Sequence, residues 1–214
     1  MKTENQKVLI LSPHTDDAEL GAGGYISKLI EDGHEIMWVV FSSARESVPK
    51  GLPNNTLSEE FESVVKSISL SPSNYIIHDY KVRRLHEHRQ DVLENLVQIR
   101  NSFQPTLVIG PSIHDYHQDH QVVAREMIRA FKSYSSIICY ELPWNNVQFD
   151  NQMFIRLEQR HIDSKIKLLQ HYKSQIIKQR NYFDSDFIIG QARVKGTCVA
   201  CKYAESFEVI RWIL

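Results

Sequence analysis

Short apolar runs alternate with longer segments of helical period along the first two thirds of the chain. Short apolar runs bounded by turn residues are typical of buried strands, and apolar positions three and four apart are typical of a helix packed on a sheet. Strands are predicted at residues 8–13, 35–42, 75–78, 106–111 and 137–141. Helices are predicted between them at residues 20–31, 57–70, 87–103 and 121–133. This alternation predicts βαβ units and a mostly parallel sheet.

The last third of the chain has a different pattern of apolar and polar positions. After Pro143 the pattern predicts a short strand at residues 155–157, a long polar helix from about 161 to 179, and a final strand at 207–213. No repeat or flexible linker separates this part from the rest. We therefore expect one domain over residues 1–214, with a βα core over about 1–142 and a C-terminal flank or cap over about 143–214. The expected fold is α/β, a Rossmann-like three-layer sandwich with its site at the carboxyl edge of the strands.

Composition narrows the class of protein. The chain has 214 residues, of which 42% are hydrophobic and 24% charged, so disordered, collagen-like and coiled-coil proteins are excluded. Its 25 basic and 26 acidic residues leave no positive surplus for a phosphate backbone, which argues against nucleic acid as the principal partner. The apolar runs fall far short of the ~18 residues of a spanning helix, and residues 1–7 lack the apolar core of a secretory signal.

The three cysteines do not suggest a disulfide framework. Their number is odd, and a reducing compartment is the simpler environment for them, so we expect a cytoplasmic protein. Cys198 and Cys201 have the spacing of a redox or zinc clip, but no second pair accompanies them, and we expect two small buried thiols instead. The sequence leaves the oligomeric state open, a homo-oligomer included.

Chemistry-bearing residues follow two of the predicted strands. The first strand runs into residues 12–19 (SPHTDDAE), and the strand at 106–111 runs into residues 112–120 (SIHDYHQDH), where three of the ten histidines lie within seven positions. Ligands of open α/β sheets bind outside the carboxyl ends of the strands. We therefore expect the two loops to face one another across one site.

The residue types in these loops favour a catalytic metal site. Such a site takes three protein ligands from His, Asp, Glu or Cys and keeps one position for water, whose pKa falls toward ~7. His14, one of Asp16 and Asp17, and a histidine of the second loop supply such a set. The other aspartate is then available to take a proton. The residues alone do not decide between the two aspartates, or between His117 and His120.

These loops resemble the two signature motifs of the LmbE-like (PIG-L) metal-dependent N-acetylglucosaminyl deacetylases. The usual family forms are His-Pro-Asp-Asp-Glu and His-Pro-Asp-His, which correspond to residues 14–18 and 117–120 here. The resemblance continues in the Lys-rich segment at 165–175 and the closing segment at 203–211, so it covers nearly the whole chain. Two motifs in the right order, each after a buried strand, make the match specific.

The resemblance implies a function and a role for each residue. It implies a hydrolase that removes the acetyl group from a small N-acetylated amino sugar, releasing acetate and the free amine. It implies a bound metal, normally zinc, although two histidines and one carboxylate also suit Fe(II). The implied roles are metal ligands for His14, Asp17 and His120, general base for Asp16, oxyanion stabiliser or acid for His117, and orientation of His117 for Asp119.

Three positions depart from the family pattern. Thr15 and Gln118 replace prolines, which changes loop rigidity and removes no ligand. Ala18 replaces the usual glutamate beside the site. Two rival functions remain: another metal-dependent amidase or imidohydrolase on the same scaffold, or a non-catalytic carbohydrate or nucleotide binder.

Basic and aromatic residues near the predicted sheet edge are candidates for substrate contact. Arg45 follows the second strand, and Arg83 and Arg84 follow the third, so each could reach a phosphate or carboxylate of the substrate. Trp144 could stack on a sugar ring or pack at the rim. The glycines at 21, 23 and 24 do not fit a dinucleotide fingerprint, and we interpret them as positions of close helix packing beneath the site.

Overall fold

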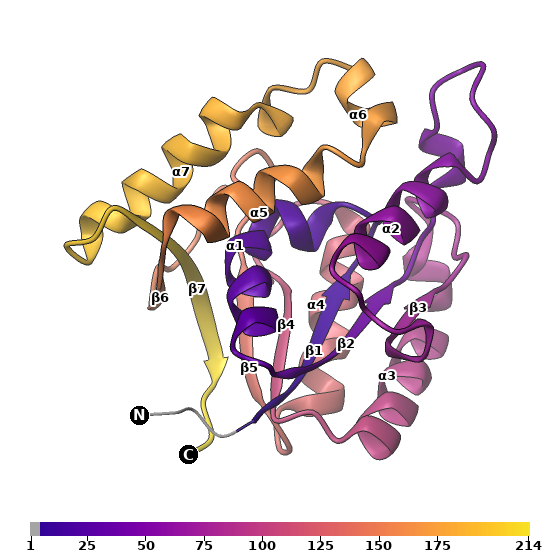
Figure 1. Ribbon diagram of the computed structural model, residues 1–214. Helices are drawn as coiled ribbons and strands as arrows, with labels where there is room; N and C mark the ends of the chain where they lie inside the picture. Colours follow the sequence, from indigo (N-terminus) through magenta and orange to yellow (C-terminus); the bar gives the residue numbers. More distant parts are fainter. Residues whose placement is uncertain (1–4) are drawn as a thin grey trace.

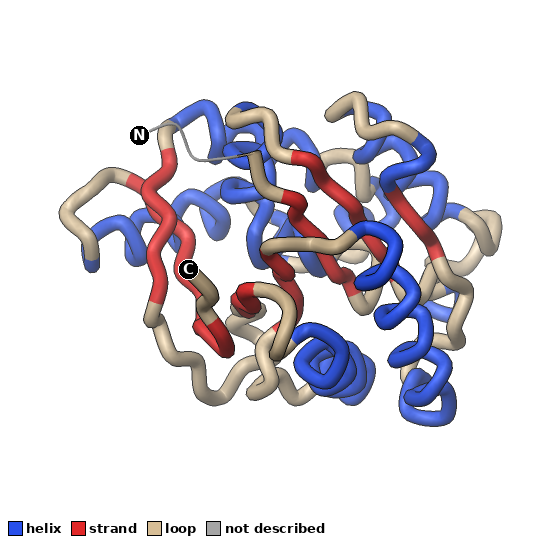
Figure 2. The backbone as a smooth tube through the Cα atoms, turned by 90° about the horizontal axis from the view of Figure 1, so that it is seen from below, coloured by secondary structure: helices blue, strands red, loops and turns tan. Residues whose placement is uncertain are grey.

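The computed structural model describes residues 5–214, which form one seven-stranded sheet with helices on both faces (Figures 1 and 2). The strand order is β3-β2-β1-β4-β5-β7-β6. The first five strands in this order pair in parallel, and β7 pairs antiparallel with both β5 and β6. The strand bounds are β1 Lys7–Ser12, β2 Glu35–Val40, β3 Tyr75–Ile77, β4 Leu107–Pro111, β5 Ser136–Tyr140, β6 Met153–Leu157 and β7 Tyr203–Arg211. The predicted mostly parallel α/β sheet is therefore confirmed.

The helices connect these strands. Their bounds are α1 Asp17–Glu31, α2 Thr56–Ser67, α3 Arg89–Phe103, α4 Gln118–Phe131, α5 Gln159–Leu169, α6 Lys173–Ile177 and α7 Ser185–Cys198. Four short 3-10 helices lie at Arg45–Ser47, Pro72–Asn74, Leu85–His88 and Asn181–Phe183. No helix within residues 5–214 combines the length and the apolar character needed to cross a bilayer.

The core consists of two apolar layers, one on each face of the sheet. Alternate residues of β1 point to opposite faces, so Val8 and Ile10 pack with α1, α2, α5 and α7, whereas Leu9 and Leu11 pack with α3 and α4. All four side chains are fully buried. This covering of both faces explains why the parallel strands are continuous apolar runs in the sequence.

Two helices begin earlier than the apolar pattern predicts. Helix α1 begins at Asp17 and α4 at Gln118, each three residues before the predicted start. The added residues are the polar ones of the two signature loops. The first turn of a helix tolerates polar and acidic side chains because its N–H groups are unpaired, so the apolar period does not mark it. As a result, Asp17 and His120 lie on helices and not in loops.

The C-terminal third differs from its prediction in two places. The predicted long helix at 161–179 is wrong as a single element, because α5 ends at Leu169 and α6 begins at Lys173. Tyr172 lies in the break, fully buried, and its hydroxyl bonds the signature loop, so tertiary contacts end α5 there. Helix α7 is not predicted at all. Its buried stripe is only Ile188, Ala192 and Gly196, too sparse to give a strong helical period.

Glycines let α1 lie close to the sheet, as the sequence suggested. A Cβ atom on Gly21 would lie 2.3 Å from Cδ2 of Tyr140, and one on Gly24 would lie 2.5 Å from Cδ1 of Leu157. Real Cβ atoms do not approach carbon this closely, so any side chain at Gly21 would displace β5. This packing places the first turn of α1 directly beside the carboxyl ends of β1 and β5.

Candidate metal centre

A cavity of about 210 Å³ opens at the carboxyl edge of the sheet. The loops that follow all five parallel strands contribute to its wall, together with the segment around α6. Strand β1 lies between β2 and β4, so the order of strands reverses direction at this point of the sheet. Ligands of open α/β sheets bind at such a topological switch point. Its lining includes His14, Asp16, Asp17, Ser47, Val82, His117, His120, Trp144, Asn145, Gln175, Lys178, Arg180 and Tyr182.

Three ligand-type atoms converge at the bottom of this cavity. His14 Nδ1 and His120 Nε2 are 3.2 Å apart, and each lies 3.1 Å from Asp17 Oδ2. Ligands at the zinc distance of about 2.0–2.1 Å in a tetrahedral site are separated by about 3.3 Å, so this triangle has the size of one face of such a site. The three side chains are buried, with His120 only 1% exposed. His14 and His120 also form a wider three-histidine group with His117, whose ligand atoms lie within 4.8 Å of one another.

Two further carboxylates hold the outer nitrogens of these histidines. Asp119 Oδ2 lies 3.0 Å from His14 Nε2, and Asp115 Oδ2 lies 2.7 Å from His120 Nδ1. An ionised carboxylate only accepts, so in its neutral form each histidine donates outward and turns a lone pair toward Asp17. With both rings neutral, the three facing acceptor atoms need a cation between them, and without a metal ion a proton on each ring fills that need. The donor set therefore fits a divalent ion of the zinc class, with carboxylates supporting the histidines as metal sites commonly have.

The charges of the cluster also favour a cation at its centre. Burial lowers the pKa of His14 and His120, but the carboxylates around them outweigh it and raise the two values to about 9 and about 10. Burial raises the pKa of Asp17, yet the positive charges of His120 and His14 hold it well below its usual range. The cluster thus stabilises positive charge at its centre, which protons or a metal ion can supply.

Asp16 occupies the N-cap position of α1, where an aspartate normally accepts a hydrogen bond from the helix. Its side chain makes no such capping bond and lines the cavity instead. Burial, together with the charge of Asp17, raises the pKa of Asp16 to about 6. A carboxylate with a pKa near neutrality is suited to accept and return a proton.

His117 is the N-cap residue of α4 and also lines the cavity. Its Nδ1 accepts a hydrogen bond from the backbone N–H of Asp119 at 3.2 Å. In the neutral ring the proton is therefore on Nε2. Burial and the positive charges of His120 and His14 lower the pKa of His117 to about 4, so the ring is neutral near pH 7. His117 consequently offers an N–H donor to the cavity.

Asp119 contacts His117 through its backbone N–H, whereas its carboxylate, which we expected to orient His117, lies against another ring. Its carboxylate binds the ring of His14, and it also accepts hydrogen bonds from the backbone N–H groups of Arg83 and Leu85. Asp115, which sequence reasoning left unassigned, holds His120 and accepts a bond from the backbone N–H of His117 at 2.7 Å. Its position in a run of polar residues gave no signal that distinguished it from its neighbours.

A buried acid supports the first signature loop from behind. The Tyr172 hydroxyl lies 2.5 Å from both the Thr15 carbonyl oxygen and Glu19 Oε1. The hydroxyl has one proton to donate and two acceptors within reach, the carbonyl oxygen and the carboxyl group. Burial raises the pKa of Glu19 well above its ordinary value. Ala18, where the family usually has glutamate, is fully buried in the apolar core.

The three arginines proposed as substrate contacts lie elsewhere. Arg45 pairs with Asp79 at 2.9 Å and Arg84 with Glu87 at 2.6 Å, both at the exposed surface. Within residues 5–214 neither these two nor Arg83 is among the residues that line the cavity. The lysine and arginine that do line it are Lys178 and Arg180, at the end of the helix predicted at 161–179 and just after it, and sequence reasoning did not single them out.

The structure also tests the expectations for the cysteines and for Trp144. Cys198 is exposed at the end of α7 and Cys201 is half-buried, so the expectation of two buried thiols is wrong. Both are free, as is the buried Cys139. Trp144 lines the cavity but stacks on Tyr182, with ring centroids 3.9 Å apart and an interplanar angle of 11°. It packs at the rim as an aromatic pair.

Comparison with known proteins agrees with the motifs. The family model PIG-L, described as GlcNAc-PI de-N-acetylase, matches residues 9–131, more than half of the chain. The uncharacterized deacetylase YaiS of Escherichia coli is 24% identical over 172 residues, which are 78% of this chain and 90% of YaiS. The chain therefore belongs to the PIG-L family, and the expected family membership is confirmed.

Solved structures share the fold at lower identity. The N,N'-diacetylchitobiose deacetylase of Pyrococcus horikoshii superposes with a TM-score of 0.79 at 19% identity, covering 97% of this chain and 84% of that one. The 4-carboxy-2-hydroxymuconate hydratase GalB of Pseudomonas putida superposes with a TM-score of 0.78 at 16% identity, covering 98% of each chain. One fold thus carries hydrolytic deacetylases and a hydratase, so the fold alone does not assign the reaction.

Proposed function

We propose that this member of the PIG-L family is a zinc-dependent hydrolase that removes the acetyl group from an N-acetylated amino sugar. The observation that carries the proposal is the convergence of His14 Nδ1, Asp17 Oδ2 and His120 Nε2 within 3.1–3.2 Å, beside a free carboxylate in an open cavity. Fe(II) suits the same ligands. The family model supports the acetamide as the bond that is cleaved.

The metal ligands in this proposal are His14, Asp17 and His120. An ion held there lowers the pKa of a water and polarises a carbonyl group. Asp119 and Asp115 fix the ring orientations of the two histidines, which keeps the ligand atoms in place without the ion. Tyr172 and Glu19 hold the backbone of the first loop from the opposite side.

Asp16 is the proposed general base. A water attacks the acetyl carbonyl carbon, and Asp16 takes the proton that the water loses. When the carbon–nitrogen bond breaks, the nitrogen needs one proton to leave as an amine, and Asp16 can return the one it took. A pKa of about 6 allows both transfers near neutral pH.

His117 is the proposed donor to the carbonyl oxygen. Its Nδ1 is occupied by the backbone of α4, so the Nε2–H faces the cavity. As the water adds, negative charge develops on the carbonyl oxygen, and a donor already oriented toward that position stabilises it most. The acetyl methyl group can rest against Ala44, Leu57 and Val82, a small apolar cluster of which each member lines the cavity.

The test combines metal content with acetate release. Protein purified without chelator is analysed by elemental mass spectrometry and then assayed for acetate with N-acetylglucosamine, its phosphates and N,N'-diacetylchitobiose. We expect about one zinc or iron per chain, acetate release from at least one sugar, loss of both after chelation, and recovery on adding the ion back.

Two results would contradict the proposal. A chain that binds no metal even after reconstitution would favour a non-catalytic binder. A metal-loaded chain that releases no acetate from any acetamide would favour another reaction on the same centre, such as the hydration catalysed by the similarly folded GalB.

A further inference from the structure

Two cationic side chains face the cavity, and the nearest carboxylates act on their charges from beyond ion-pair distance. Lys178 and Arg180 both line it, and within residues 5–214 no carboxylate lies within 4.0 Å of either charged group to form an ion pair. The Lys178 ammonium donates to the backbone carbonyl oxygen of Ser47, and the Arg180 guanidinium lies 5.6 Å from the centre of the Tyr182 ring. Neither partner is a carboxylate, and the charges of Asp16 and Glu60 act from beyond that distance, Asp16 on both cations and Glu60 on Lys178.

Other basic groups near this edge of the sheet differ from this pair. Arg45 and Arg84 each have a carboxylate at 2.9 Å or less, and Arg89 reaches the buried Glu126. Those three arginines do not line the cavity, and each has a carboxylate partner. Lys178 and Arg180 are placed in a concave site beside one another, where burial and the neighbouring Arg180 lower the pKa of Lys178. Two like charges brought together in a cavity favour binding of an anion.

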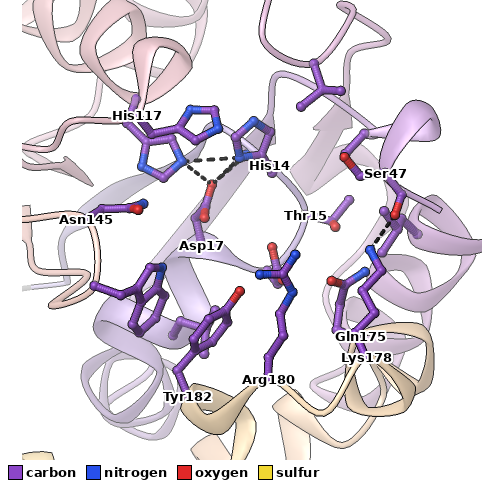
Figure 3. A pocket seen from close by; sticks show the side chains of 17 residues that line it. His14, Thr15, Asp17, Ser47, His117, Asn145, Gln175, Lys178, Arg180 and Tyr182 are labelled. Atoms are coloured by element: carbon purple, nitrogen blue, oxygen red, sulfur yellow. Dashed lines mark hydrogen bonds and ion pairs between the residues drawn. The ribbon is translucent and has the colours of Figure 1, made fainter. Parts of the chain in front are cut away.

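The backbone shows how both side chains come to face inward. Lys178 follows the end of α6, and Gln179 has a φ of 52°, in the left-handed region that costs a residue with a side chain about 1–2 kcal/mol. This left-handed residue separates the two cations along the chain. Figure 3 shows Lys178, Arg180 and Tyr182 rising from the α6 side of the cavity, while His14, Asp17 and His117 lie on the other side.

From these contacts we propose that Lys178 and Arg180 form an anion subsite, so that the substrate is an N-acetylated amino sugar bearing a phosphate or carboxylate group. This inference rests on the proposed function for the acetamide end of the substrate. With the acetyl group at His14, Asp17 and His120, the sugar ring spans the cavity and its acidic substituent meets the guanidinium and the ammonium. Arginine binds both kinds of anion through paired N–H donors.

A different role for Arg180 must be separated from this one. Its positive charge lowers the pKa of Asp16, so it could act on the proposed base and not on the substrate. An effect through Asp16 would change the rate for every substrate alike. An anion subsite changes the rate only for substrates that carry the anion.

The experiment therefore compares three substrates on metal-loaded protein. N-acetylglucosamine is neutral, N-acetylglucosamine 1-phosphate carries a phosphate, and N-acetylmuramic acid carries a carboxylate. Acetate release gives kcat/KM for the wild type, for the double variant Lys178→Gln/Arg180→Gln, and for Arg180→Lys, which keeps the charge. Arg193→Gln, an exposed arginine on α7, is the matched control for loss of one surface charge.

We expect the wild type to prefer at least one anionic substrate over the neutral one by about 10-fold or more. The double variant should lose roughly 10- to 100-fold more in kcat/KM for that anionic substrate than for the neutral one. Arg180→Lys should retain most of the preference, and Arg193→Gln should retain all of it. The substrate with the larger loss identifies the anion as phosphate or carboxylate.

Equal losses on all three substrates, or no wild-type preference for either anion, would overturn the subsite. Absence of acetate from every substrate would instead count against the proposed function, and calorimetric binding of the same three sugars then tests the subsite on its own. Binding of an anionic sugar that weakens at least 10-fold in the double variant supports it. Affinities of the anionic sugars that the double variant leaves unchanged, or no binding of them at millimolar concentration, overturn it.

Discussion

The two sides of the cavity are built in opposite ways. On the side formed by residues 13–17 and 112–120, the histidines and carboxylates that bind one another in a closed network are buried: His14, Asp17, Asp115, Asp119 and His120. The side formed by residues 173–183 is mostly exposed and presents Lys178 and Arg180, which form no ion pair within residues 5–214. A closed network holds its atoms in one arrangement, whereas unpaired groups leave their interactions to a ligand. We infer that the first side determines the reaction and the second selects the substrate.

The largest effect is expected from a substitution at the centre of the closed network. His120→Ala removes one of three converging atoms and leaves Asp17 and Asp115 without their shared partner, so metal content should fall from about one per chain to near zero. Acetate release should fall by at least about 10³-fold. Elemental mass spectrometry and the acetate assay measure the two losses.

His86→Ala is the control, because His86 is an exposed histidine on the Leu85–His88 turn, outside the cavity lining. It should keep both metal and activity. Full metal content in His120→Ala would show that the ion, if bound, uses other ligands, such as a set that includes His117.

The next effect separates catalysis from metal binding on the same side. Asp16→Asn keeps the shape of the side chain but cannot accept the proton, so kcat should fall about 10²- to 10⁴-fold while metal content stays at the wild-type value. Stopped assays with metal analysis of the same sample test this. Loss of metal equal to that in His120→Ala would assign Asp16 as a ligand instead.

A smaller effect is expected from substituting the carboxylates that bind the two histidines. Asp115→Asn weakens the acceptor of the His120 N–H, and Asp119→Asn weakens that of His14, so metal affinity should fall about 10- to 100-fold in each. Competition with a chromogenic chelator measures the affinity. Unchanged affinity in both variants would mean that the network is structural and does not support the ion.

The smallest expected effect is on stability, and it compares helix packing near the two sides of the cavity by one glycine substitution in each region. Gly21→Ala places a Cβ against the buried Tyr140 ring and should lower the free energy of unfolding by about 1–3 kcal/mol. Gly190→Ala on α7 meets nothing within 4 Å and should raise it by about 0.5–1 kcal/mol, because alanine favours the helix. Denaturant unfolding measures both. Equal changes in the free energy of unfolding would show that the two regions do not differ in packing.

The sequence predicted the elements of the core because their signals are local. Strand β1 and its neighbours are apolar runs, and the order of strands and helices follows from the alternation of two periods. The signature loops were recognisable for the same reason, since each is a short run of residues after a strand. The long helix predicted at 161–179 failed where a distant contact, Tyr172 on the first loop, overrode the local pattern.

What the sequence determined by itself is therefore the class of fold, the family, and the residues from which the centre is made. What only the tertiary structure decided is their arrangement: Asp17 and not Asp16 faces both histidines, Asp119 holds His14 across 105 positions of sequence, and Lys178 with Arg180 replaces the predicted arginines at the cavity. The physical reason is that periodicity and motifs report neighbours along the chain. Ligand geometry and counter-charges depend on segments that meet only after the sheet has formed.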